Sequence, residues 1–196
     1  MRFLPLLLLS CALIASAAEL PFVDDFSDSQ LQTRRAVRGA WTFKDGVASV
    51  TQDDELYAKF KNHGPIIFYD LTYTDAVIEF DFRPQEAQTV VFTANGADGH
   101  VFRTISSARG TDLRAFPPGA DEHSVSLLRL EHPLAQGQWT HMKVVLQGDS
   151  ATVTLGDAAP AVVHHPSLKR AKENASIGFS FGQLSVRHFT AQPISE

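Results

Sequence analysis

Three charged residues, Glu79, Asp81 and Arg83, are spaced by two along one apolar segment, positions 78–83. Side chains of a β-strand alternate between two faces, so the three charged groups would share one face, with neighbours roughly 6.5 to 7 Å apart. Two carboxylates beside a guanidinium suit general acid or base chemistry, with Glu79 and Asp81 as the catalytic candidates and Arg83 binding the substrate. The alternative is an ordinary solvated sheet face on which the arginine screens two like charges.

A second polar group follows along the chain. Asp112 and Arg114 would share one face of a strand, and His100 and Arg103 precede them. His100 follows a glycine-containing turn, so it could present its imidazole at the rim of a sheet beside Arg103 and act as a base. Arginines and carboxylates together suit polar, hydroxyl-rich or anionic small molecules. Tyr69, expected at a strand end, could stack on a sugar ring.

Other catalytic templates do not fit this sequence. It contains neither a glycine-rich loop followed by a helix nor a G-x-S-x-G elbow, which excludes the common phosphate-cradling folds and the serine hydrolase elbow. The adjacent His164 and His165 would point to opposite faces of a strand, so we predict no catalytic metal and no resident cofactor. Asp24, Asp25 and Asp28 leave a structural calcium ion open.

The elements that must position these residues are short extended segments. Apolar residues recur mostly with period two, and turn residues interrupt them about every 8 to 12 residues, as in all-β sandwiches and barrels. We therefore predict an all-β fold of one sandwich domain. The predicted strands are residues 47–50, 66–69, 77–83, 89–94, 101–106, 112–116, 125–130, 139–147, 151–155, 176–181 and 184–189.

Turns, helices and tryptophans complete the prediction. The Gly-Asp pair at 148–149 and the Gly-Gln pair at 182–183 favour hairpin bends. Only residues 29–35 and 167–173 have a helical pattern. Trp41 and Trp139 are interpreted as core anchors, with a sugar platform as the alternative for each.

The first residues have the pattern of a targeting segment. Arg2 precedes an apolar run rich in leucine, and four small residues at 15–18 offer a cleavage site. The apolar run is shorter than the roughly 20 residues that span a bilayer, so we predict a signal peptide over 1–18 and one domain over 19–196. The mature protein would be exported, periplasmic or extracellular, and not an integral membrane protein.

The sole cysteine, Cys11, lies inside that segment, so the mature chain could form no disulfide and use no thiolate. The alternative interpretation of Cys11 is a bacterial lipoprotein anchor. The formal net charge is -5, and the one short basic run is followed directly by a glutamate. Nucleic acid is therefore excluded as a partner, because phosphate backbones attract basic surfaces.

Across nearly the whole mature sequence, the chain resembles the concanavalin A-like lectin and glucanase group. The segments that carry the resemblance are Phe-Val-Asp-Asp-Phe at 22–26, Trp41, Asp-Gly-Val at 45–47, residues 75–83, and residues 139–145 leading into Gly-Asp at 148–149. The resemblance implies a two-sheet antiparallel jelly-roll sandwich with a sugar site on its concave sheet.

The order of segments is also similar to the 3-keto-disaccharide hydrolase domain, found in exported proteins of polysaccharide-degrading bacteria. The acidic-aromatic-arginine element of that family matches Asp81, Phe82 and Arg83. Its following element, Asn-Ser-Gly and then an arginine, does not match, because residues 89–95 read Thr-Val-Val-Phe-Thr-Ala-Asn.

Two functions follow from different classes. The first is an exported carbohydrate-binding module, in which the polar faces bind sugar hydroxyls and an aromatic residue packs on the ring. The second is a glycan-processing enzyme, for which the resemblance implies a keto-sugar substrate. In that enzyme Asp81, Glu79 or His100 would remove the proton next to the carbonyl. A two-carboxylate glycosidase is a third option: it needs carboxyl groups about 5 to 9.5 Å apart, and Glu79 and Asp81 on one strand could satisfy that spacing. Convergence of these groups in one pocket would favour catalysis. A structural exported protein is a further alternative.

Overall fold

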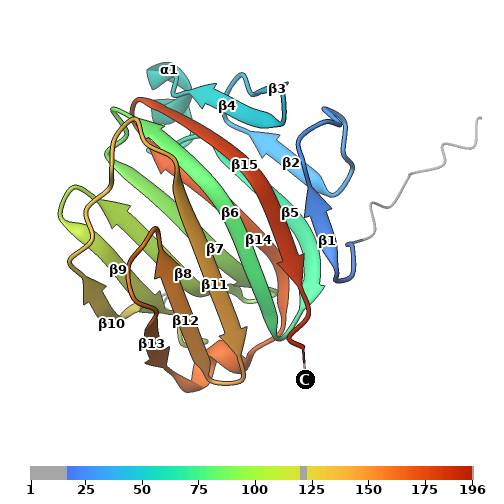
Figure 1. Ribbon diagram of the computed structural model, residues 1–196, viewed down its shortest axis with the longest axis vertical. Helices are drawn as coiled ribbons and strands as arrows, with labels where there is room; N and C mark the ends of the chain where they lie inside the picture. Colours follow the sequence, from blue (N-terminus) through green and yellow to red (C-terminus); the bar gives the residue numbers. More distant parts are fainter. Residues whose placement is uncertain (1–16, 120–122, 196) are drawn as a thin grey trace, which may run out of the picture.

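The protein is described from a computed structural model, which covers residues 17–119 and 123–195. The expected segment at 1–18, with Cys11, lies almost wholly outside these residues. The chain folds into two antiparallel sheets packed face to face, in which one sheet lies in front of the other in Figure 1. This confirms the predicted all-β, two-sheet antiparallel jelly-roll sandwich.

The first sheet, sheet I, has the strand order β13-β12-β11-β6-β15-β4-β3, with β1 also paired to β15. Its strands are β1 (Phe22–Asp24), β3 (Thr42–Lys44), β4 (Val47–Thr51), β6 (Ala76–Gln85), β11 (Thr140–Gln147), β12 (Ser150–Leu155), β13 (Ala161–His164) and β15 (Gln183–Gln192).

The second sheet, sheet II, has the order β10-β9-β8-β7-β14-β5-β2. Its strands are β2 (Arg34–Val37), β5 (Ile66–Tyr73), β7 (Thr89–Gly96), β8 (Gly99–Ser107), β9 (Gly110–Ala115), β10 (Val125–Leu130) and β14 (Lys172–Ser180). Two short helices lie outside the sheets: α1 (Asp54–Lys59) and the 3-10 helix η1 (Pro166–Lys169).

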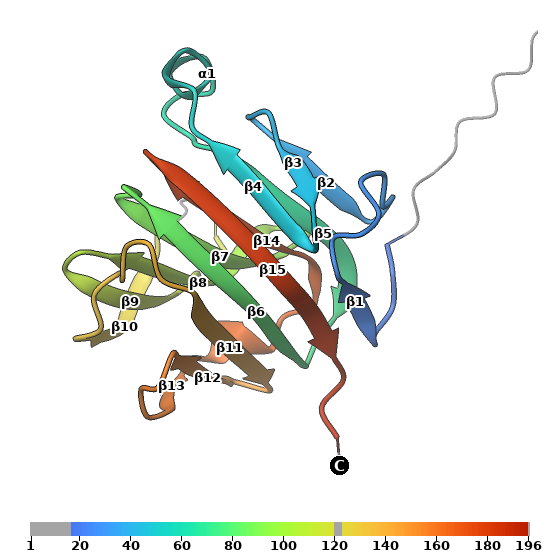
Figure 2. The same ribbon diagram turned by 45° about the horizontal axis from the view of Figure 1, so that its top comes forward.

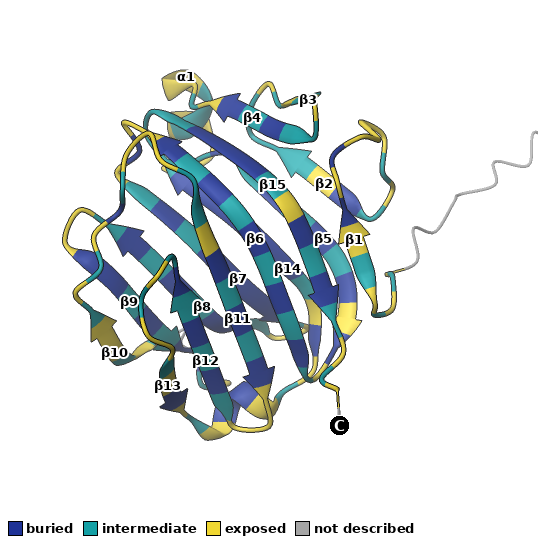
Figure 3. Cartoon of the chain, in the orientation of Figure 1, coloured by how far each residue is buried: buried dark blue, intermediate teal, exposed yellow. Residues whose placement is uncertain are grey.

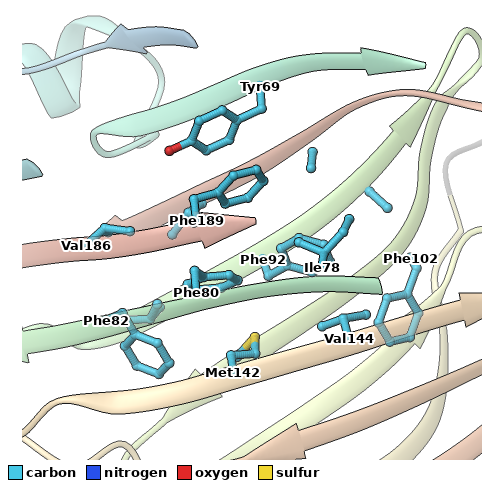
Figure 4. Packing of buried hydrophobic residues seen from close by; sticks show 14 of the residues in the cluster. Tyr69, Ile78, Phe80, Phe82, Phe92, Phe102, Met142, Val144, Val186 and Phe189 are labelled. Carbon is cyan, nitrogen blue, oxygen red and sulfur yellow. The ribbon is translucent and has the colours of Figure 1, made fainter. Parts of the chain in front are cut away.

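On β5, β6 and β12, every second side chain enters the space between the sheets. On β6, Ile78, Phe80 and Phe82 are at most 1% exposed, and the charged residues between them are partly exposed, as predicted. Figure 3 shows the same alternation along β6. Aromatic rings cross the middle of the core in Figure 4, where the ring of Tyr69 stacks on that of Phe189 with centroids 3.7 Å apart.

Three local predictions are wrong. Residues 29–35 form turns and the start of β2, because the Asp28 carboxylate accepts a hydrogen bond from the backbone N–H of Gln30 and β2 pairs with β5. Residues 167–173 are divided between η1 and β14. The pair at 182–183 joins strands of different sheets, so it forms a corner and not a hairpin. The pair at 148–149 does form the β11–β12 hairpin.

Helix α1 was not predicted from the sequence, although its start carries a capping signal. Asp53 accepts a hydrogen bond from the backbone N–H of Leu56 at 2.9 Å, as an N-cap residue does. Asp54 and Glu55 in the first turn and Lys59 in the last turn complement the helix dipole.

A buried ion pair ties the edges of the two sheets together. Arg34 of β2 binds Asp24 of β1 at 2.7 Å, and the two side chains are 1% and 2% exposed. The Tyr69 hydroxyl also donates a hydrogen bond to Asp24, at 3.1 Å. The Arg34 guanidinium also lies 4.0 Å from the ring centroid of Phe43 on β3. Burial, followed by the Asp24 charge, raises the pKa of Tyr69 well above its usual value, so its hydroxyl remains a donor.

We predict that Arg34→Ala lowers the free energy of unfolding by about 3–5 kcal/mol, because it leaves the buried Asp24 carboxylate without its counter-charge. The control is Arg35→Ala. Arg35 binds Asp70 at the same 2.7 Å but is 50% exposed, so its loss should cost less than about 1 kcal/mol. Urea unfolding of both variants measures the difference. Equal losses in the two variants would contradict this account of the Asp24 pair.

Candidate functional site

The residues predicted to form one site lie in three different places. Glu79, Asp81 and Arg83 lie on the outer face of sheet I. His100, Arg103, Asp112 and Arg114 lie on the outer face of sheet II, on β8 and β9. The two groups are therefore separated by the core, and the arrangement in which Glu79 or Asp81 acts beside His100 and Arg103 is wrong.

Tyr69 lies inside the core, so it cannot be a sugar platform. Its side chain is 0% exposed, stacked on Phe189 and hydrogen-bonded to Asp24. Strand β5 continues to Tyr73, and Ile67, Tyr69, Leu71 and Tyr73 all face inward. Tyr69 is thus in the middle of a strand and not at its end.

A hollow of about 690 Å³ opens on the outer face of sheet II and is the candidate site. We call it the groove. Its floor includes alternate residues of β7, from Thr89 to Asn95, and residues of β5, β8 and β14. Successive outward residues of a strand lie about 7 Å apart, so the four outward positions of β7 extend over roughly 20 Å. The groove is thus long enough for an extended ligand.

A chain of hydrogen bonds crosses one end of the groove. The Nδ1 atom of His100 lies 2.5 Å from Oδ1 of Asn95, and Nδ2 of Asn95 donates to Oδ1 of Asn174 at 2.7 Å. An amide oxygen only accepts, so His100 donates from Nδ1, and the neutral tautomer that can do this carries its lone pair on Nε2. The asparagines thereby select the tautomer in which Nε2 is the basic atom.

Arg103 and Phe116 complete this end of the groove. Nε of Arg103 donates to the Thr93 hydroxyl at 3.1 Å, and its guanidinium lies 5.0 Å from the ring centroid of Phe116. The same ring meets the His100 ring edge to face at 5.1 Å. Arg170 holds the backbone behind them by donating to the carbonyl oxygens of His100 at 2.6 Å and Phe116 at 2.7 Å.

The opposite end of the groove is formed by α1 and the loop that follows it. Tyr57 of α1 packs against Phe181 with ring centroids 5.1 Å apart and lines the groove with Asn62 and His63. The loop then approaches β14 closely at Gly64, where a Cβ atom would lie 2.0 Å from the carbonyl oxygen of Phe179. Only glycine fits at that position.

Asp112 and Arg114 flank the groove and do not line it. Their side chains form an ion pair, and Arg114 also donates from Nε to the hydroxyl of Ser124 at 2.9 Å. Ser124 lines the groove. The pair therefore supports the wall next to Phe116.

Sequence reasoning missed Asn95, Asn174 and the α1 end of the groove. Asn95 and Asn174 meet because β7 pairs with β14, which is 79 residues further along the chain. Nothing in either segment indicates that pairing. The α1 end could have been found from Asp53 and the acidic residues that follow it.

The charged residues on sheet I bind one another. Asp81 accepts hydrogen bonds from His141 at 2.8 Å, Arg187 at 2.9 Å and His188 at 3.1 Å. Partial burial alone would raise the pKa of Asp81, but these three hydrogen bonds outweigh it and hold the pKa below its usual value. Glu79 binds Lys143 at 2.7 Å. This carboxylate pair is thus engaged in ion pairs on the sheet surface.

The two tryptophans have different environments. Trp41 packs against the core, as predicted. Trp139 lies next to the guanidinium groups of Arg83 and Arg187, 4.9 and 4.2 Å from its ring centroid, and is not part of the core cluster. Its interpretation as a core anchor is therefore wrong.

In the parts of the chain that the structure describes, no group of three or more His, Cys, Asp or Glu residues could hold a metal ion. The carboxylates considered for calcium bind protein groups: Asp24 binds Arg34, Asp25 accepts from Ser27, and Asp28 accepts from Gln30.

Among the helices of residues 17–119 and 123–195, none is long and apolar enough to cross a membrane.

Comparison with known proteins gives a fold and no family. No family model matches the sequence, and no curated protein matches it. Among solved structures, the carbohydrate-binding module CBM66 from Bacillus subtilis is similar with a TM-score of 0.62 and 12% identity, covering 90% of this chain and 99% of that one. The Bacillus licheniformis β-glucanase has a TM-score of 0.61 and 11% identity, with 89% and 98% covered.

A third similar structure is congerin II with lactose bound, which has a TM-score of 0.52 and 7% identity and covers 63% of this chain and 96% of its own. At these identities the similarity establishes the jelly-roll sandwich alone.

We predict that Asp81→Asn destabilises the protein at neutral pH and that the difference from the wild type disappears in acid. The folded protein lowers the pKa of Asp81 below its ordinary 3.8, so its stabilisation is present above that value and is lost as the pH falls through the folded pKa. Melting temperatures between neutral pH and strong acid measure the effect. Asp157→Asn, in an exposed turn, is the control and should track the wild type at every pH. A pH-independent loss in Asp81→Asn would contradict the prediction.

Proposed function

We propose that this protein is an exported carbohydrate-binding sandwich that binds a glycan or sugar derivative in the groove over sheet II. The observation that carries the proposal is the end of the groove at which His100 and Arg103 contact the ring of Phe116 and Asn95 binds His100. Sugars present hydroxyl groups that both donate and accept, together with apolar ring faces. Fixed polar groups next to an aromatic ring in a hollow are suited to that chemistry.

The positions of Glu79 and Asp81 argue against a two-carboxylate glycosidase that uses this pair in the groove. Among the described residues that line it, none is an aspartate or glutamate. Such a glycosidase needs two carboxyl groups facing each other across the scissile bond, about 5 to 9.5 Å apart. Glu79 and Asp81 lie on the other sheet and are held by Lys143 and by His141, Arg187 and His188.

One observation supports a second candidate, an enzyme that acts on a keto-sugar. The bond from His100 Nδ1 to Asn95 places the basic lone pair on Nε2. That nitrogen could take the proton next to a sugar carbonyl, while Arg103 stabilises the enolate oxygen that receives the electron pair. As the enolate re-forms the carbonyl, a C=C bond would form between the deprotonated carbon and the next carbon, and the C–O bond to the aglycone would break. The departing oxygen would take back the proton held on Nε2 of His100, so the aglycone leaves as an alcohol.

We predict that Arg103→Ala weakens glycan binding by about tenfold or more, because a charge-assisted hydrogen bond and the packing on Phe116 are lost. Arg83→Ala is a closely matched control, since Arg83 lies 4.9 Å from an aromatic centroid on the opposite sheet and Arg103 lies 5.0 Å from one. Isothermal calorimetry against oligosaccharides and 3-keto-glucosides measures both. Loss of binding in Arg83→Ala with none in Arg103→Ala would move the site to sheet I and overturn the proposal.

A steric block tests the same groove without removing a polar group. Gly178 lies on its floor, and a Cβ there would make ordinary contacts of 3.4 Å with Ile66 and the carbonyl oxygen of Pro65. Gly178→Leu should therefore fold and abolish binding, whereas Thr152→Leu on sheet I should bind normally.

Turnover of a keto-glucoside that is lost in His100→Asn would support the enzyme. Binding of sugars without turnover would support the binding module.

A further inference from the structure

A second hollow, of about 630 Å³, opens where the edges of the two sheets meet. It is lined by β2 at the edge of sheet II, by Phe43 on β3 at the edge of sheet I, and by residues 29–32. Figure 2 shows β2 and β3 side by side at this end of the molecule. We call it the edge hollow.

The edge hollow contains an indole held in a fixed position. Trp41 lines it, packs against the core, and donates from Nε1 to the carbonyl oxygen of Val37 at 3.1 Å. Three of the neighbouring lining residues, Ala36, Gly39 and Ala40, have small side chains or none, which leaves room beside the ring. A fixed and partly exposed indole is the side chain that packs best on a sugar ring face.

Amide and guanidinium groups surround the indole. Gln30 and Gln32 are exposed, and the loop that carries them is held by Asp28, which accepts from the backbone N–H of Gln30 at 2.8 Å. Nε2 of Gln32 donates to the carbonyl oxygen of Gln30 at 3.2 Å, which leaves its Oε1 to accept. Arg35 uses Nε and Nη2 to bind Asp70, and its Nη1 makes no hydrogen bond to any residue that the structure describes.

The edge hollow continues the groove around the edge of sheet II. Arg35 lines the edge hollow and Phe68 lines the groove. The two residues pair across β2 and β5, and the Arg35 guanidinium lies 4.8 Å from the centroid of the Phe68 ring. The two hollows are thus separated by one side-chain contact.

We propose that one glycan chain occupies both hollows, crossing the edge of sheet II over Arg35 and Phe68 and stacking its distal sugar on Trp41. This inference rests on the proposed function of the groove, and it adds that the ligand is an oligosaccharide and not a single sugar. The polar groups of Gln30, Gln32 and Arg35 would bind the hydroxyls of the distal unit.

The two tryptophans of the chain make the test direct. We expect two indole N–H signals in a ¹⁵N-labelled sample, one in the edge hollow and one, from Trp139, on the outer face of sheet I. Matched disaccharides and hexasaccharides of glucose, galactose, xylose and fructose are titrated in. The disaccharide that shifts the Thr93 and Phe68 amides should leave both indole signals in place. Its hexasaccharide should shift the Trp41 signal and leave that of Trp139 unchanged.

Affinity supplies the second measurement. The hexasaccharide should bind about tenfold more tightly than the disaccharide, and Trp41→Ala should remove that gain while keeping the affinity for the disaccharide. Because Trp41 packs against the core, Gln32→Ala in the exposed loop is the second variant and should reduce the gain in part.

Each outcome decides between the two proposals. If a hexasaccharide shifts the groove amides and leaves the Trp41 indole still, the inference falls and the groove proposal stands. If Trp41 shifts and the groove amides do not, the edge hollow is a separate site and the groove proposal falls along with the continuous chain. If no sugar in the panel shifts either set, both proposals are overturned for these sugar classes.

Discussion

The burial of alternate side chains between two sheets is the constraint on which the rest of this structure depends. Once Ile78, Phe80 and Phe82 enter the core, the charged residues between them must lie on the outer face of β6. The same rule applied to β7 and β8 places Thr93 and Arg103 on the outer face of the opposite sheet. The core therefore creates two outer surfaces and separates polar residues that lie close together in the sequence.

Those two surfaces have different chemical character. On sheet I, Asp81 is surrounded by three donors and Glu79 by Lys143 and His141, so the charges neutralise one another within the protein. On sheet II, the groove is lined by hydrogen-bonding side chains and by aromatic rings, which include those of Tyr57, Phe68 and Phe116. A surface of the second kind can exchange its hydration for a polyhydroxylated ligand, because the ligand replaces both the hydrogen bonds and the apolar contact.

The fold class and the strand phase could be predicted from the sequence, because period-two alternation is local. The division into sheets could not. Strands β6 and β7 follow each other directly, yet β6 pairs with β11 and β15 while β7 pairs with β8 and β14. Continuing the alternation from Ile67 through Leu71 would have placed Tyr69 in the core, because all three share one phase. Tyr69 was placed wrongly because the strand was predicted to end there, whereas β5 continues to Tyr73. His100 and Asp81 were grouped wrongly because the sheet to which each strand belongs is set by long-range pairing.

Strand β2 shows how the core and both hollows are connected. Its adjacent residues Arg34 and Arg35 are both arginines, but their side chains point to opposite faces of the strand. Arg34 is buried, and its ion pair with Asp24 links the edge of sheet II to sheet I. Arg35 lies on the outer face, where it contacts the ring of Phe68 and forms an ion pair with Asp70. Because one backbone segment carries both, the buried pair that stabilises the edge also sets the position of the contact between the groove and the edge hollow. A shift of β2 would therefore change the fold and the ligand surface together.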